Sequence, residues 1–230
     1  MKTLFNNKKI YIFDLDWVIL NIENINFIAY CSAIDSILNK PLSFQEYREN
    51  FQWKRFCDGI NLFMRACSLE NEIQNLRKRI GEKVFLHKKE LLSRESLSKY
   101  TTKGIIPFLK FLKNKQYKIW LATSTTFFFV DIILNNLGIT SSFDVILTSE
   151  SVKHWKPSPE IYKLAFSSLW WTNNFYTWLV FEDSNDWIKS ALDSGLCCIG
   201  IGEVPHTAFD WDKNYKFWGN DFWAFISYIV

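Results

Sequence analysis

The sequence predicts an α/β protein: a doubly wound parallel sheet with an inserted α-helical domain. Two observations carry this prediction. Short apolar runs typical of buried strands alternate with segments that have apolar residues at helical spacing. A single long stretch, residues 24–95, lacks strand signals and is rich in Lys, Arg and Glu. Alternating strands and helices imply right-handed crossovers and a parallel sheet.

The first expected strand covers residues 10–13, and helical spacing then dominates the insertion. Helices are expected there at residues 24–38, 43–50, 58–66 and 69–92. After the insertion, strands are expected at residues 118–122, 145–147, 176–181 and 197–201. The intervening helices are expected at residues 105–114, 126–137, 158–169, 185–194 and 221–229. Pro107 suits the first turn of its helix, and Gly138 and Gly195 suit helix ends. We therefore expect a core of residues 1–20 and 97–230 and a helical domain of residues 21–96.

The composition and charge of the chain argue against several classes of function. The chain has 230 residues, 48% of them hydrophobic, which is enough for a well-buried core. A net charge of +3 is too small to indicate a nucleic-acid or membrane-surface partner. No run of 18 apolar residues and no signal-peptide pattern is present, and the five cysteines show neither metal spacing nor a disulfide framework. We expect a cytoplasmic protein, a monomer or weak homodimer, that binds a small molecule.

Two aspartates follow the first apolar run. Asp14 and Asp16 are spaced i, i+2, which in a strand places both on one side. Carboxylates at the end of a buried strand are costly unless a cation holds them. Magnesium would do so and would leave one carboxylate free to attack a phosphorus atom.

Three further polar segments follow later strands. They are Thr123 to Thr125, Lys156 in a Lys-Pro-Ser-Pro-Glu run, and Glu182-Asp183-Ser184. In an open parallel sheet, ligands bind at the carboxyl ends of the strands, where these segments converge. Hydroxyls can bind phosphoryl oxygens, the lysine offsets negative charge, and the carboxylates supply oxygen ligands for a hard cation. The alternatives are ordinary turn residues at 14 and 16, a plain strand-end Thr123, a solvated Lys156, and a Glu182 that only neighbours a helix start.

The order of these motifs resembles the haloacid-dehalogenase-like (HAD-like) hydrolase superfamily. The matching segments are Phe-Asp-Leu-Asp, Leu-Ala-Thr-Ser, Lys-Pro-Ser-Pro-Glu-Ile-Tyr and Leu-Val-Phe-Glu-Asp-Ser. The resemblance is greatest to the branch with a helical cap, which contains phosphoglycolate phosphatase and β-phosphoglucomutase. It implies a Rossmann-like core, a cap in the insertion after the first strand, and Mg²⁺ as the cofactor.

The resemblance also implies roles for individual residues. Asp14 would be the nucleophile that forms an aspartyl-phosphate, and Asp16 the general acid and base. Thr123 and Ser124 would bind phosphate, and Lys156 would stabilise the phosphoryl oxygens and the nucleophile. The metal ligands would be Asp14, Glu182, Asp183 and the Asp16 carbonyl. In the cap, Lys54 and Arg55 are candidates for substrate contact, or equally for a solvated basic face beside Arg48.

Tryptophan and glycine are present in abnormal proportion. The chain has 11 Trp and 8 Gly, whereas glycine usually makes up about 7% of residues. Tryptophan stands at several positions where the family favours glycine: Trp17, Trp53, Trp120, Trp155, Trp170 or Trp171, and Trp187. Glycine serves such positions through positive φ or close backbone approach, which tryptophan cannot reproduce.

We therefore hypothesise that many of these tryptophans are a translation artefact. A gene from a genome that reads UGA as glycine, translated with a UGA-to-Trp table, would give this pattern. The alternative is a divergent protein with an aromatic-rich core, and the codons distinguish the two.

Three functions are compatible with the sequence. The first is a magnesium-dependent phosphatase of a small phosphorylated metabolite, of the sugar phosphate or phosphoglycolate type. The second is a β-phosphoglucomutase-like phosphomutase, which would share every core residue. The third is a catalytically inactive HAD-fold binding protein, if Trp17, Trp155 and Trp187 are real and fill the site.

Overall fold

The computed structural model describes residues 8–52, 54, 56–167, 177–202, 207–209, 212–219 and 221–229. The chain forms two compact units. One contains Met1–Asn21 and Leu97–Val230, and the other contains Ile22–Ser96. We call them the core unit and the helical unit.

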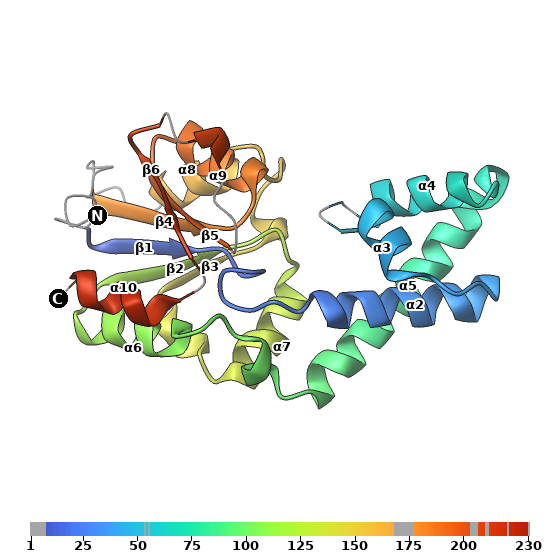
Figure 1. Cartoon of the computed structure of the whole chain (residues 1–230), viewed down its shortest axis with the longest axis horizontal. Coiled ribbons are helices and arrows are strands. Elements are labelled where there is room, and N and C mark those ends of the chain that lie inside the picture. Colours follow the sequence, from blue (N-terminus) through green and yellow to red (C-terminus); the bar gives the residue numbers. More distant parts are fainter. Residues whose placement is uncertain are drawn as a thin grey trace. The chain divides into compact units, whose positions relative to one another are not determined.

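Within the described residues, the core unit contains a six-stranded parallel sheet with the strand order β3-β2-β1-β4-β5-β6 (Figure 1). The strands are β1 (Ile10–Phe13), β2 (Lys118–Ala122), β3 (Val145–Leu147), β4 (Trp178–Glu182), β5 (Cys197–Ile201) and β6 (Tyr215–Trp218). Their residues are mostly apolar and buried, as expected of strands covered on both faces. The predicted doubly wound parallel sheet is confirmed.

The position of β1 decides where a ligand can bind. The chain runs from β1 outward through β2 to β3, and then returns to place β4 on the other side of β1. Phe13 of β1 pairs with Leu121 of β2 and Phe181 of β4, so the three strands end side by side. The strand order reverses between β1 and β4, and such a switch point is where open α/β sheets bind ligands.

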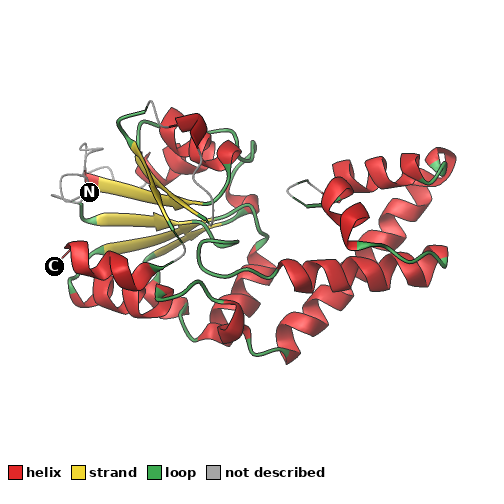
Figure 2. Cartoon of the chain, in the orientation of Figure 1, coloured by secondary structure: helices red, strands yellow, loops and turns green. Residues whose placement is uncertain are grey.

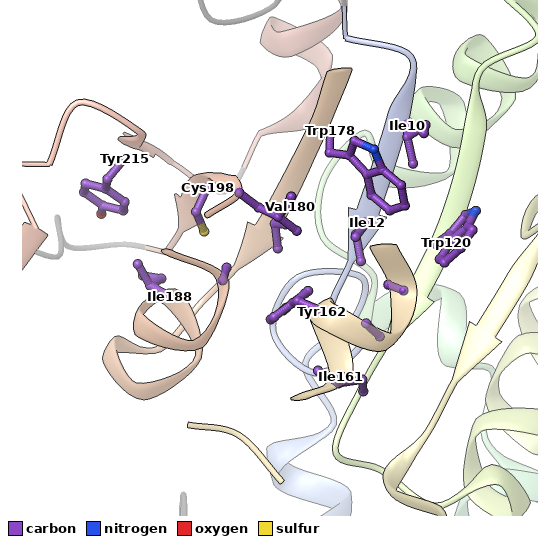
Figure 3. Close-up of a cluster of buried hydrophobic side chains, with 14 of the residues drawn as sticks. Ile10, Ile12, Trp120, Ile161, Tyr162, Trp178, Val180, Ile188, Cys198 and Tyr215 are labelled. Carbon is purple, nitrogen blue, oxygen red and sulfur yellow. The ribbon is translucent and has the colours of Figure 1, made fainter. Parts of the chain in front are cut away.

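Successive side chains along each strand point to opposite faces of the sheet, so the core of this unit has one apolar layer on each face. One face of the sheet packs against α8 (Glu160–Ser167) and α9 (Asn185–Asp193), and Figure 3 draws this cluster with Ile12, Val180 and Tyr162 labelled. The opposite face packs against α6 (Ile105–Asn114) and α10 (Phe222–Ile229). Aromatic rings fill that opposite face, including a stacked Phe13–Phe181 pair with centroids 4.6 Å apart. A further helix of this unit, α7 (Phe127–Leu137), ends at Gly138.

The helical unit consists of helices in its described part (Figure 2). They are α2 (Glu23–Leu38), α3 (Phe44–Asn50), α4 (Phe56–Ala66) and α5 (Ile73–Arg94). Ser43 begins α3 with a capping box, in which its side chain accepts from the Glu46 N–H and Glu46 accepts from the Ser43 N–H. Buried residues such as Ile34, Phe63 and Ile80 give this unit an apolar core of its own.

Several predicted elements need correction. The helix predicted at residues 58–66 begins at Phe56, and the helix predicted at residues 158–169 begins at Glu160. The edge strand β6 was not predicted, although Tyr215 is buried and Lys216 exposed, which is the alternation of an edge strand. The last insertion helix begins at Ile73 rather than 69, because residues Glu70–Glu72 form a 3₁₀ turn. The fourth strand begins at Trp178 in the described part, while residue 176 lies outside it.

None of the described helices is both long and apolar enough to cross a membrane.

Candidate active site

Asp14 and Glu182 lie next to each other because of the sheet register. The Asp14 N–H donates to the Phe181 carbonyl at 3.1 Å, which extends the β1–β4 ladder by one residue. Asp14 continues the side-chain alternation of Ile10 and Ile12, so it points toward the face covered by α8 and α9. Glu182 follows Val180 in the same way, and both carboxylates are fully buried.

Lys156 joins these two carboxylates. Its Nζ donates to Asp14 Oδ1 at 2.9 Å, to Glu182 Oε1 at 2.5 Å and to the Ala122 carbonyl at 2.8 Å. All three ammonium protons are thereby used, and the side chain is almost completely buried. A buried lysine is stable only with such partners, so the interpretation of Lys156 as a solvated loop residue is wrong.

Three carboxylates form a candidate metal centre. Asp14, Glu182 and Asp183 each contribute one oxygen to a group in which all lie within 4.8 Å of one another. Asp14 Oδ2, Glu182 Oε2 and Asp183 Oδ1 are buried and have no hydrogen-bond donor within the described structure. Buried carboxylate oxygens without donors are costly, and a hard divalent cation with oxygen ligands would satisfy them. The residues present therefore fit a magnesium ion.

The ionisation of the site follows from burial and neighbouring charge. Burial raises the pKa of the Asp14 and Asp183 carboxyls well above the usual value, and their mutual repulsion with Glu182 adds to this. Burial also raises the pKa of Glu182, although Lys156 opposes the shift. For Lys156, burial by itself would lower the pKa, but Asp14 and Glu182 outweigh it and raise the pKa. The three buried carboxyls thus bind a proton, or a cation in its place, more readily than exposed carboxyls do.

Asp16 lies in a different environment from Asp14. It is half-buried, and its Oδ2 accepts a 2.7 Å hydrogen bond from Thr125 Oγ1. Its side chain is not part of the three-carboxylate group. A second carboxylate that is accessible and separately held suits proton transfer to and from a substrate oxygen.

The second strand positions the hydroxyl residues. Thr123 directly follows β2 and is buried, and its N–H donates to the Leu147 carbonyl at 3.0 Å. Thr123 Oγ1 accepts from the Thr125 N–H at 3.1 Å, which shapes the turn that also carries the half-buried Ser124. Sequence reasoning grouped Thr125 with this hydroxyl cluster but did not predict its bond to Asp16.

Trp17 has a backbone conformation that favours glycine. Its φ of 64° lies in the left-handed region, where a bulky side chain is a genuine outlier. The Trp17 N–H donates to the Leu20 carbonyl at 2.8 Å and so closes a tight turn directly after Asp16. Positive φ at this position agrees with the expectation that the turn is built for glycine.

The other described tryptophans at expected glycine positions have ordinary φ. Trp120 is buried in β2 and packs edge-to-face on Trp178 with centroids 5.4 Å apart. Trp155 is partly exposed, and its Nε1 donates to the Ser149 carbonyl at 3.1 Å. The ring of Trp187 lies with its centroid 5.1 Å from Lys156 Nζ, a cation–π contact. For these three, the argument from positive φ does not hold.

The remaining residues singled out in the sequence are Lys54, Arg55, Trp53, Trp170 and Trp171. Lys54 belongs to the helical unit, where it is exposed and its Nζ donates to the Glu49 carbonyl at 2.8 Å. Arg55, Trp53, Trp170 and Trp171 lie outside the described residues. Their expected roles stay predictions.

Similarity to known proteins agrees with this geometry. The family model for haloacid dehalogenase-like hydrolases matches residues 11–201. A phosphorylated carbohydrates phosphatase of Thermotoga maritima is 31% identical over 185 residues, which cover 80% of this chain and 81% of that protein.

Solved structures share the fold. A Thermotoga maritima protein provisionally named as a β-phosphoglucomutase superposes with a TM-score of 0.76 at 25% identity, over 96% of this chain and 100% of that one. A β-phosphoglucomutase of Clostridium difficile gives a TM-score of 0.68 at 21% identity, over 85% of each chain. The sheet, the ordered motifs and the family match together show that this chain belongs to the haloacid dehalogenase-like hydrolases.

Proposed function

We propose that the protein is a magnesium-dependent phosphatase of a small phosphorylated carbohydrate, acting through an aspartyl-phosphate on Asp14. The observation that carries this proposal is the buried group of Asp14, Glu182 and Asp183 with Lys156 bonded to Asp14. The name of the Thermotoga maritima phosphatase supports a carbohydrate phosphate as substrate. Phosphoglycolate, which is not a carbohydrate, is the other substrate that we propose to test.

The proposed roles follow from the contacts of each side chain. An Asp14 oxygen attacks phosphorus, the bond from phosphorus to the leaving oxygen breaks, and Asp16 gives that oxygen a proton. Asp16 then removes a proton from water, which attacks phosphorus and frees Asp14 and inorganic phosphate. Lys156 offsets negative charge beside Asp14, and Thr123 and Ser124 bind the phosphoryl oxygens.

Asp14, Glu182, Asp183 and the Asp16 carbonyl would hold the magnesium ion. When bound, Mg²⁺ neutralises charge on the phosphoryl oxygens and on the nucleophile. Binding of one Asp14 oxygen to the ion would also fix the orientation of the Asp14 side chain.

Phosphate release from sugar phosphates and phosphoglycolate tests this function. Asp14→Asn should reduce turnover to background, and Asp16→Asn should reduce it by about 10²–10⁴-fold, the usual contribution of acid–base catalysis. Asp193→Asn is the matched control, because Asp193 is exposed on α9 and pairs there with exposed Lys189. Wild-type activity in Asp14→Asn would refute the proposed nucleophile.

A phosphomutase is the second candidate, favoured by the provisional name of the Thermotoga maritima structure. It would use the same core residues but return the phosphoryl group to a sugar instead of water. Assays of a sugar phosphate with and without a bisphosphate primer separate the two. Primer-dependent isomerisation with little free phosphate would favour the mutase.

We further propose that residues 22–96 serve as a cap that selects the substrate, with Lys54 and Arg55 as candidate contacts. Ala substitutions at these positions should raise KM more than they lower kcat, because uniform binding would be lost. An unchanged KM would favour their interpretation as a solvated basic face.

The tryptophan hypothesis belongs to the same proposal. Trp17 favours the glycine interpretation through its φ, whereas Trp120, Trp155 and Trp187 do not. If the codons for these positions are UGG, the recoding hypothesis is wrong. The third candidate, an inactive binding protein, then gains support if neither the chain as written nor a variant with glycine at 17, 155 and 187 releases phosphate.

A further inference from the structure

Tyr162 lies directly behind the candidate active site. It is on α8, which packs on the sheet face that carries Asp14 and Glu182, and its side chain is fully buried (Figure 3). Its hydroxyl donates a hydrogen bond to Glu182 Oε1. Tyr162 thus belongs both to the apolar core and to the polar site at the strand ends.

The two oxygens of Glu182 have different partners. Oε1 accepts from Tyr162 Oη and from Lys156 Nζ, which approach from separate elements. Oε2 is buried and accepts from no donor in the described part of the chain. Two donors on one oxygen restrain the carboxylate plane. They leave Oε2 as the Glu182 oxygen that is available to a cation bound by the group of Asp14, Glu182 and Asp183.

Burial alone does not account for the hydroxyl of Tyr162. Tyr11 is equally buried on the opposite face of the sheet, and its hydroxyl has no hydrogen-bond partner within the described residues. The fold therefore tolerates a buried phenol without a bond, and the Tyr162–Glu182 contact is a specific feature of the site. The Tyr162 ring also lies with its centroid 5.3 Å from Lys156 Nζ.

We propose that Tyr162 is a positioning residue that holds Glu182 in the orientation needed to bind the divalent cation. The inference rests on the proposed function, because it assumes that Glu182 is a metal ligand. Without the Tyr162 hydroxyl, Lys156 would be the one remaining donor to Oε1 among the described residues, and the carboxylate could rotate. Partners of metal ligands commonly alter metal affinity by about 10–100-fold when they are removed.

Tyr162→Phe tests the proposal, because it removes the hydroxyl and keeps the ring and its contact with Lys156. We expect Mg²⁺ to bind about 10–100-fold more weakly in a calorimetric titration. Phosphatase turnover should approach the wild-type value when Mg²⁺ is raised in proportion. Tyr11→Phe is the matched control and should bind Mg²⁺ as the wild type does. Thermal unfolding without Mg²⁺ shows whether each variant is folded.

Wild-type Mg²⁺ affinity in a folded Tyr162→Phe protein would overturn the proposal and leave the proposed function intact. Equal weakening in both variants, or failure of Tyr162→Phe to fold, would overturn it too, because Tyr162 would then act through general packing. If the wild-type protein binds no Mg²⁺, the metal part of the proposed function fails and this inference fails with it.

Discussion

Lys156 is the residue on which the charge balance of the site depends. It is the cation bonded to both Asp14 and Glu182, and only 1% of its side chain is exposed. Breaking a buried ion pair by removing one partner leaves an uncompensated charge, which costs about 3–5 kcal/mol. Lys156 should therefore contribute to the free energy of unfolding as well as to catalysis.

Lys156→Met should lower the free energy of unfolding by about 3–5 kcal/mol near neutral pH and abolish turnover. The loss should shrink at acidic pH, because protonated carboxyls no longer need the cation. Urea unfolding at several pH values measures this. Lys8→Met is the control: Lys8 is also buried, but its Nζ donates to the Trp178 carbonyl at 2.9 Å, and its replacement should leave turnover unchanged. A pH-independent loss in Lys156→Met would contradict the prediction.

Trp17 stores backbone strain beside the acid–base residue. A side chain in the left-handed region costs about 1–2 kcal/mol, whereas glycine has no such penalty. Trp17→Gly should therefore raise the free energy of unfolding by about 1 kcal/mol and increase phosphatase activity. Trp155→Gly, at a position with ordinary φ, should not stabilise the protein. Destabilisation by Trp17→Gly in chemical unfolding would show that lost side-chain packing outweighs the strain.

At the scale of an element, the end of helix α7 shows the same preference of a positive φ for glycine. Gly138 ends α7 with a φ of 64°, and its N–H donates to the Asn135 carbonyl at 3.1 Å. A Cβ at Gly138 would meet no atom within 4 Å, so space is not limiting. Glycine is required there by conformation alone.

Gly138→Ala should destabilise the protein by about 1 kcal/mol, the cost of the left-handed conformation for a residue with a Cβ. Gly219→Ala is matched in space, because a Cβ there also meets no atom within 4 Å, but its φ is not positive. It should be neutral or slightly stabilising, since alanine restricts the unfolded chain. Thermal unfolding of the two variants compares them, and equal effects would contradict the role of φ.

At the scale of the whole molecule, the buried acids link stability to pH and Mg²⁺. Their pKa values are raised in the folded state, so protons stabilise the fold. This contribution is fully present below the unfolded-state pKa of about 4 and is lost as pH rises through the raised pKa. Mg²⁺ competes with protons for the same oxygens and should replace that lost stability.

The increase in melting temperature caused by Mg²⁺ should therefore be larger at about pH 8 than at about pH 5. Exposed acids with lowered pKa, such as Glu46 and Asp144, act in the opposite direction at acidic pH and do not depend on Mg²⁺. Asp183→Asn isolates the site, because it should remove most of the Mg²⁺ effect and leave the background pH dependence. An effect of Mg²⁺ that is independent of pH would argue against binding at these carboxylates.

Much of the architecture could be predicted from local sequence. Apolar runs, helical spacing and residues such as Pro107 and Gly138 identified nearly every strand and helix, because these signals act within a few residues. The edge strand at Tyr215 was missed, since a strand of four residues that includes a charged lysine gives little periodicity. The helix start at Ile73 was misplaced by a 3₁₀ turn, which local spacing does not distinguish from a helix.

The sequence by itself determined the family and the parallel sheet. The ordered motifs indicate the family, and the alternation of strands and helices predicts the sheet. Only the tertiary structure decided which polar groups meet. Strand register put Asp14 beside Glu182, and packing of a distant loop and of α8 brought Lys156 and Tyr162 onto them. Such contacts join residues far apart in the chain, so no local pattern encodes the hydrogen bonds that give one oxygen of Glu182 two donors and leave the other free for a cation.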